Sequence, residues 1–138
     1  MRIGLFFGSF NPIHNGHLII AQHIVNQQTI DALWFVISPQ NPLKNKNTLL
    51  NQNHRKHLVD LAIGYDRKLK TSSVEFDLPK PSFTIDTLIY LKEKYPEHSF
   101  EIIMGSDSFQ NIKKWKNYDI LIKDYNLFVT SSIGISIY

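Results

Sequence analysis

The segment from Gly8 to His17, which reads Gly-Ser-Phe-Asn-Pro-Ile-His-Asn-Gly-His, constrains the fold of this chain more than any other stretch. It follows the apolar run Ile3–Phe7, which predicts a buried strand, and precedes an amphipathic run from Leu18, which predicts a helix. Pro12 fixes its own backbone and disfavours helical geometry in the residue before it. The sequence therefore predicts a tight turn between a strand and a helix.

This turn has the composition of an anion site. Gly8 and Gly16 leave no side chain between the backbone N–H groups and a ligand. The unpaired amides of a helix start and the positive end of its dipole both favour a negative charge. His14 and His17 are three residues apart, so both rings lie on one face if the helix begins near His14. We expect phosphate binding here. The alternatives are a purely structural turn, or a metal site, although zinc takes three or four ligands.

Length and composition narrow the class of protein. The 138 residues are expected to form one domain, residues 1–138, with an ordinary hydrophobic core. No apolar run is long enough to cross a bilayer, so no membrane partner is expected. The absence of cysteine excludes disulfides, and together with the lack of a signal-peptide pattern it favours a cytoplasmic protein. The net charge of +3 suits an anionic small substrate and is too small to indicate a nucleic-acid partner.

Strands and helices are predicted to alternate along the chain. The predicted strands are at about 2–7, 33–38, 69–76, 100–104 and 126–130, and the predicted helices at about 16–28, 53–64, 84–94, 107–113 and 116–123. Apolar strands separated by helices indicate an α/β fold, a Rossmann-like doubly wound parallel sheet with helices on both faces. Ligands of such sheets bind at the carboxyl ends of the strands, near the point where the strand order reverses. The turns at 8–17 and 105–107 both follow strands, so we expect them to open onto one site.

Two basic segments are further candidates for anion binding. Lys44 and Lys46 lie in the polar loop 39–52 and are either phosphate contacts or solvated side chains. The His-Arg-Lys-His run at 54–57 begins the next helix. Basic groups there oppose the helix dipole, so either a nearby anion or an exposed helix face would explain them.

Three more positions have both a structural and a functional interpretation. Ser82 or Thr84 is a candidate N-cap of the helix at 84–94, and Thr84 could also hold the polar end of a ligand. Asp107 either caps a helix or accepts a hydrogen bond from a ribose hydroxyl. Trp115 is either a core anchor or a flat wall that stacks on a ring.

Taken together, these segments resemble the bacterial nicotinate-nucleotide adenylyltransferases, a family of the nucleotidyltransferase superfamily. The resemblance runs from residue 2 to about 129 and rests on four blocks: Gly8–His17, Pro39–Lys44, Pro81–Leu88 with Glu75 upstream, and Ile102–Trp115. It implies transfer of AMP from ATP to nicotinate mononucleotide, which gives deamido-NAD and pyrophosphate. Mg²⁺ would be the cofactor, carried by the ATP phosphates.

The resemblance also implies a role for each matching residue. The catalytic residues would be His14, His17 and Lys44. The residues implied to bind ATP are Gly8, Ser9, Phe10, His14, Gly16, His17, Gly105 and Asp107. Thr84, Trp115 and Tyr118 would hold the nicotinate group, with Trp115 stacked on its ring.

The chain departs from the family pattern near its C-terminal end. Family members carry a late motif with two hydroxyl residues and an arginine that contacts the ATP phosphates. Ser131 and Ser132 match the hydroxyls, but no arginine follows Arg67. We therefore expect a shortened chain or a substitute tail, and a sheet that is incomplete at this end. Such a sheet implies either association with another chain, for example as a homo-oligomer, or marginal stability. The alternative functions are nucleotide transfer to a different phosphate acceptor, and nucleotide binding without turnover.

Overall fold

The computed structural model describes residues 1–27, 30–39, 49–131 and 134–138. Its strands are β1 (Arg2–Gly8), β2 (Ala32–Ile37), β3 (Leu69–Ser72), β4 (Ser99–Gly105), β5 (Leu127–Ser131) and β6 (Gly134–Ile137). Its α-helices are α1 (Asn15–Gln27), α2 (Gln52–Ile63), α3 (Thr84–Lys94), α4 (Ser106–Gln110) and α5 (Tyr118–Asp124), and two 3₁₀ turns are η2 (Val74–Phe76) and η3 (Ile112–Lys114). None of the helices in these ranges is both long and apolar enough to cross a membrane.

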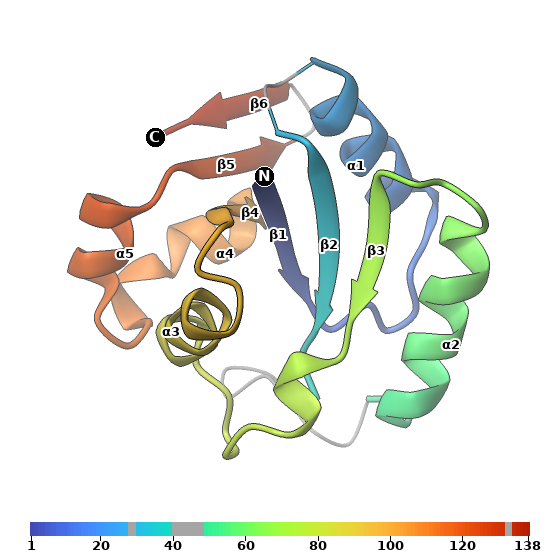
Figure 1. Ribbon diagram of the computed structural model, residues 1–138, viewed down its shortest axis with the longest axis horizontal. Coiled ribbons are helices and arrows are strands. Elements are labelled where there is room, and N and C mark those ends of the chain that lie inside the picture. Colours follow the sequence, from blue (N-terminus) through green and yellow to red (C-terminus); the bar gives the residue numbers. More distant parts are fainter. Residues whose placement is uncertain (28–29, 40–48, 132–133) are drawn as a thin grey trace.

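The six strands of the described residues form one sheet in the order β3-β2-β1-β4-β5-β6 (Figure 1). Strands β1 to β5 are parallel, and β6 runs antiparallel to β5. The chain moves outward from β1 to β3 on one side and from β4 onward on the other. The strand order therefore reverses between β1 and β4, which is where a doubly wound sheet binds its ligands. The predicted α/β fold class is confirmed.

Helices cover both faces of the sheet, and each face has its own hydrophobic cluster. Leu5 packs in the cluster that contains Leu88 and Leu91 of α3 and Leu121 of α5. Its neighbour Phe6 packs in the other cluster, with residues of α1 and α2. Successive side chains of a strand point to opposite faces, so strands buried on both faces must be continuously apolar. Residues 33–37 of β2, all of them buried, meet this requirement.

Three elements differ from the sequence prediction. The strand predicted at 69–76 ends at Ser72 and continues as η2, and the helix predicted at 107–113 is divided into α4 and η3. The third element, β6, was not predicted at all. Its residues pair with β5, for example Ile137 with Phe128, so the tail covers the edge of β5 that we expected to be open. β6 is four residues long and mostly exposed, so its conformation depends on the ladder that β5 provides.

Candidate functional site

A cavity of about 830 Å³ opens at the carboxyl ends of β1 and β4, where the strand order reverses. The turn after β1, the start of α3, the start of α4 and the segment around Trp115 line it. It brings together nine of the predicted site residues: Gly8, Ser9, Phe10, His14, His17, Thr84, Gly105, Asp107 and Trp115. Segments far apart in sequence thus converge on one site, as the topology argument predicted.

The turn after β1 contains a buried aromatic residue in an uncommon backbone conformation. Phe10 has φ of 46°, in the left-handed region, which costs an ordinary residue about 1–2 kcal/mol. Its ring is 3% exposed and meets Phe6 and Phe35 edge-on, with centroids 5.5 and 5.4 Å away. These core contacts offset the backbone cost. The Phe10 ring also meets His17 edge-on at 5.0 Å, so it forms a wall behind that imidazole.

The two histidines form a stacked pair. Their ring centroids are 3.8 Å apart and the ring planes differ by 25°. The backbone N–H of His14 donates to Nδ1 of His17 at 3.1 Å, and the N–H of Gly16 donates to Nδ1 of His14 at 3.0 Å. A ring nitrogen that accepts a hydrogen bond carries no proton, so this geometry assigns the ring proton to Nε2 in both residues. Both imidazoles can therefore present an Nε2–H donor to an anion.

A buried arginine of α2 donates hydrogen bonds to the turn after β1. Arg55 of α2 is 1% exposed, and burial lowers the pKa of its guanidinium. Its Nη1 donates to the carbonyl oxygens of Ser9 and Ser38, each at 2.7 Å. The same side chain donates to Pro39 from Nη2 at 3.1 Å and to Leu50 from Nε at 2.9 Å. The sequence interpretation placed the basic run at 54–57 near an anion or on an exposed face. For Arg55 the exposed-face alternative is wrong, because its side chain is buried and donates to backbone carbonyls.

Two serine hydroxyls at the cavity are buried without a partner. Ser9 is 6% exposed and Ser82 is 9% exposed, and in the described residues the Oγ of each has no hydrogen-bond partner. Both residues line the cavity. Burying an unpaired hydroxyl costs free energy, which a bound ligand with hydrogen-bonding groups would recover. Ser82 was considered only as a helix cap in the sequence, and its burial, which identifies it here, has no signature in the sequence.

The start of α3 is capped differently from the prediction. The N-cap is Phe83, in extended conformation with no side-chain cap bond, so neither Ser82 nor Thr84 caps this helix. Thr84 is the first helical residue and lines the cavity. Asp86 in the same turn accepts from Lys116 Nζ at 3.0 Å, and that ammonium lies 5.3 Å from the Phe83 ring centroid. Lys116, in the segment after η3, therefore contacts the first turn of α3 through Asp86 and Phe83.

Asp107 and Trp115 lie on the β4 side of the cavity. The N-cap of α4 is Gly105, so Asp107 is not the cap but an exposed residue of the first turn, and it lines the cavity. Trp115 packs against the hydrophobic core, which confirms the structural interpretation, and it also lines the cavity, where stacking on a ring stays a prediction.

Two predicted residues lie outside the cavity lining. Tyr118 packs against the core at the start of α5, and its contact with the nicotinate group stays a prediction. Gly16 acts through its N–H group, which orients the His14 ring.

Glu75 is a buried carboxyl group in the same cavity. It is 3% exposed, and its Oε2 accepts a hydrogen bond from Thr87 Oγ1 at 2.6 Å. Desolvation raises the pKa of Glu75 from 4.5 to about 7, and the hydrogen bond with Thr87 only partly opposes this shift. The sequence interpretation included Glu75 in a family block and gave it no role.

Some predicted residues lie outside the described residues, namely Lys44, Lys46 and Ser132. Among the residues that are described, no three or more His, Cys, Asp or Glu side chains group together as metal ligands.

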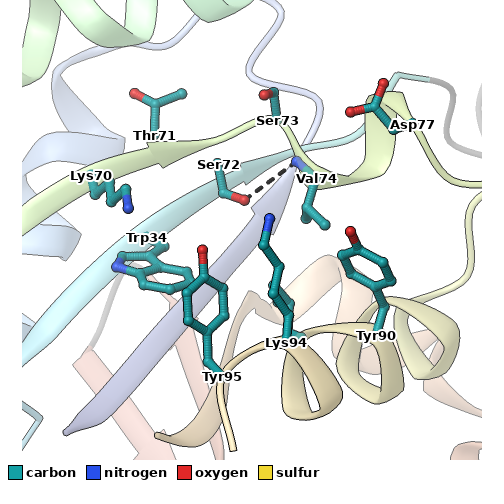
Figure 2. Close-up of a pocket in the computed structure, with 11 residues that line it drawn as sticks. Trp34, Lys70, Thr71, Ser72, Ser73, Val74, Asp77, Tyr90, Lys94 and Tyr95 are labelled. Carbon is teal, nitrogen blue, oxygen red and sulfur yellow. Dashed lines mark hydrogen bonds between the residues drawn. The ribbon is translucent and has the colours of Figure 1, made fainter.

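A smaller cavity of about 190 Å³ lies between β3 and α3, away from the predicted site residues (Figure 2). Lys70 Nζ is 5.0 Å from the centroid of Trp34, and Lys94 Nζ is 5.6 Å from that of Tyr95. Both ammonium groups therefore already have favourable aromatic partners.

Comparison with known proteins identifies relatives of this chain. A family model described as cytidylyltransferase-like matches residues 5–133. A curated protein of Flavobacterium psychrophilum, named "Probable nicotinate-nucleotide adenylyltransferase", is 48% identical over 129 residues, which cover 94% of this chain and 67% of the relative. A protein of the same name from Flavobacterium johnsoniae is 48% identical over 134 residues, which cover 97% of this chain and 69% of the relative. The chain thus spans about two thirds of the length of these relatives.

A solved structure shares the fold. The nicotinic acid mononucleotide adenylyltransferase of Plasmodium falciparum, complexed with NaAD, superimposes with a TM-score of 0.78 at 25% sequence identity. The superposition covers 93% of this chain and 63% of that chain.

Proposed function

Because this chain belongs to the nicotinate-nucleotide adenylyltransferase family, we propose that it transfers AMP from ATP to nicotinate mononucleotide and releases pyrophosphate. The product is deamido-NAD, an intermediate of NAD biosynthesis. The observation that carries the proposal is the stacked pair of His14 and His17, whose Nδ1 atoms both accept from backbone amides. Two Nε2–H donors beside a glycine-containing turn suit the phosphates of ATP.

The reaction requires no nucleophile from the protein. A phosphate oxygen of the mononucleotide attacks the α-phosphorus of ATP in line. An oxygen–phosphorus bond forms as the bond to the bridging oxygen of pyrophosphate breaks, and pyrophosphate leaves with that electron pair. The protein contributes alignment of the two phosphates and stabilisation of the developing charge. His14 and His17 would provide this stabilisation, with Lys44 as a further phosphate contact.

Other residues would bind the two ends of the substrates. Gly105 and Asp107 would hold the adenosine, since the carboxylate of Asp107 can accept from ribose hydroxyls. Thr84 and the unpartnered hydroxyl of Ser82 would donate toward the nicotinate carboxylate, and Trp115 would stack on the ring. Hydroxyl donors favour a carboxylate over an amide at this point because a carboxylate only accepts hydrogen bonds.

Mg²⁺ would be the cofactor and would enter with ATP. The turn offers two imidazole Nε2–H donors, which suit anions, whereas Mg²⁺ prefers oxygen ligands. These residues therefore fit a metal carried on the phosphate oxygens, where it offsets the negative charge of the phosphates. A cytoplasmic location, the single domain 1–138 and association between copies stay predictions.

The test is pyrophosphate release from ATP with three acceptors: nicotinate mononucleotide, nicotinamide mononucleotide and phosphopantetheine. The proposal expects clear release with nicotinate mononucleotide and much less with the other two. Faster release with phosphopantetheine would instead indicate a different phosphate acceptor. Nucleotide binding without pyrophosphate from any acceptor would indicate a protein that binds nucleotides without turnover.

A further inference from the structure

Glu75 is an acidic residue in a cavity that the proposed function assigns to anionic substrates. It lies in η2, directly after β3, and lines the cavity together with Ser82, Phe83 and Thr84. An ionised carboxylate here would repel a substrate carboxylate, so its protonation state matters for binding.

The hydrogen bonds that Thr87 makes depend on whether the carboxyl group of Glu75 is protonated. Thr87 Oγ1 lies 2.6 Å from Glu75 Oε2 and 3.3 Å from the carbonyl oxygen of Phe83. A hydroxyl donates only one hydrogen bond, and a carboxylate and a carbonyl are both acceptors. While Glu75 is ionised, Thr87 must divide its one proton between the two acceptors; when Glu75 is protonated, it can donate to Thr87, and Thr87 can donate fully to Phe83. An ionised Glu75 would take the Thr87 proton away from Phe83.

The burial of Glu75 is consistent with the protonated form. Desolvation raises its pKa to about 7, and no cation contributes to this shift. The charged or titratable groups that line the same cavity are His14 and His17 from the turn and α1, Asp107 from α4, Lys114 from η3, and Lys116 after it. Of these, Lys116 is paired with Asp86 at 3.0 Å.

The Phe83 carbonyl accepts several hydrogen bonds at the start of α3, next to residues that line the cavity. Phe83 is the N-cap of α3, and its carbonyl also accepts from the backbone N–H groups of Asp86 and Thr87. The next residue, Thr84, and the preceding Ser82 face the proposed nicotinate position. A change in the hydrogen bond to this carbonyl therefore acts on the residues that would hold the substrate.

We propose that Glu75 is a positioning residue that acts in its protonated form, donating to Thr87 so that Thr87 orients the first turn of α3 toward the nicotinate group. The inference rests on the proposed function of the cavity. Loss of the proton has two effects, a weaker contact to Phe83 and a negative charge beside the substrate carboxylate. Both effects weaken the binding of nicotinate mononucleotide at high pH.

The test compares the 138-residue chain with its Glu75→Gln variant, which keeps a neutral donor at every pH. The KM for nicotinate mononucleotide and the KM for ATP are measured from pH 5.5 to 9. Wild-type KM for the mononucleotide is expected to rise at least threefold above pH 7, relative to the variant. The KM for ATP is expected to follow the same profile in both proteins. Titration of the substrate phosphate is common to both proteins and cancels in their ratio.

Matched variants separate positioning from a merely structural role. Thr87→Val removes the relay and should weaken mononucleotide binding at all pH values, whereas Thr87→Ser should restore it. Asp77→Asn changes an exposed carboxyl group two residues from Glu75 and should behave as wild type. Identical pH profiles in wild type and Glu75→Gln would overturn the proposal.

A second measurement does not depend on turnover. The amide resonance of Thr87 should titrate with pH in the wild type, and this titration should be lost in Glu75→Gln. If no pyrophosphate forms, the proposed function fails and this titration alone decides whether the relay exists. If pyrophosphate forms without a Glu75-dependent pH profile, only the positioning role fails.

Discussion

Arg55 Nη1 donates to the carbonyl oxygen of Ser9 at 2.7 Å, across a separation of 46 residues. This hydrogen bond joins the first turn of α2 to the turn that contains the histidine pair. Because the guanidinium also binds carbonyls of Ser38, Pro39 and Leu50, one side chain connects three segments near the proposed phosphate site. Asn11 completes the connection, since its Oδ1 accepts from the backbone N–H of Leu50 at 2.9 Å.

Replacement of Arg55 should therefore affect both stability and activity. Arg55→Met leaves buried carbonyls unpaired, and we expect the free energy of unfolding to fall by about 2–4 kcal/mol. Arg55→Lys keeps the charge but not the planar fork, and should raise the KM for ATP severalfold. Denaturant titration and steady-state kinetics provide the measurements. Arg67→Gln, at an exposed arginine, is the control, and equal effects from both sites would refute the anchoring role.

The histidine pair should be needed for turnover more than for folding. His14 is exposed, so His14→Ala should change the thermal midpoint little. Removal of a hydrogen-bond donor to transition-state charge typically costs about 10²–10³ in kcat, and we expect losses of that size for His14→Ala and His17→Ala. His23→Ala, at an exposed position of α1, should keep wild-type kcat. Full activity in the double variant His14→Ala/His17→Ala would contradict the proposed chemistry.

Gly16 offers a test of the geometry of His14 without removal of its ring. A Cβ at position 16 would lie 2.8 Å from Cε1 and 3.0 Å from Nδ1 of His14. The exposed ring can move aside, so Gly16→Ala should keep the fold but lower kcat about tenfold or more. His23→Ala, at an exposed position of the same helix and outside the cavity lining, is the control. Retained activity in Gly16→Ala would mean that the ring position seen here is not required.

The buried carboxyl group of Glu75 should make stability depend on pH. Its pKa is 4.5 in the unfolded chain and about 7 in the folded one, so between these values the folded state holds a proton that the unfolded state has lost. The free energy of unfolding therefore falls as pH rises through this window, by up to about 3 kcal/mol, and stays low above it. Glu75→Gln should remove this dependence.

Chemical denaturation of both proteins at pH 4, 6 and 8 measures this effect of Glu75. The variant should match the wild type at pH 4 and exceed it at pH 8. A constant difference between the two proteins across this range would show that Glu75 does not titrate within it.

The sequence by itself determined the order of the strands from β1 to β5 and of the main helices, the parallel sheet, and the position of the turn that contains His14 and His17. Continuous apolar runs such as that of β2 identify strands buried on both faces, and the Gly/Pro-rich turn with its two histidines is contiguous, so its local pattern suffices. The helix predicted at 84–94 agrees with α3 residue for residue.

Only the tertiary structure decided which side chains meet across the cavity. Arg55 lies in a run of basic residues, and nothing in that run distinguishes the one that points inward. The pairing of Glu75 with Thr87, the unpartnered hydroxyl of Ser82 and the addition of β6 to the sheet are likewise invisible in the sequence. Each depends on burial or on a partner from a distant segment, because desolvation and long-range hydrogen bonds exist only once the chain has folded.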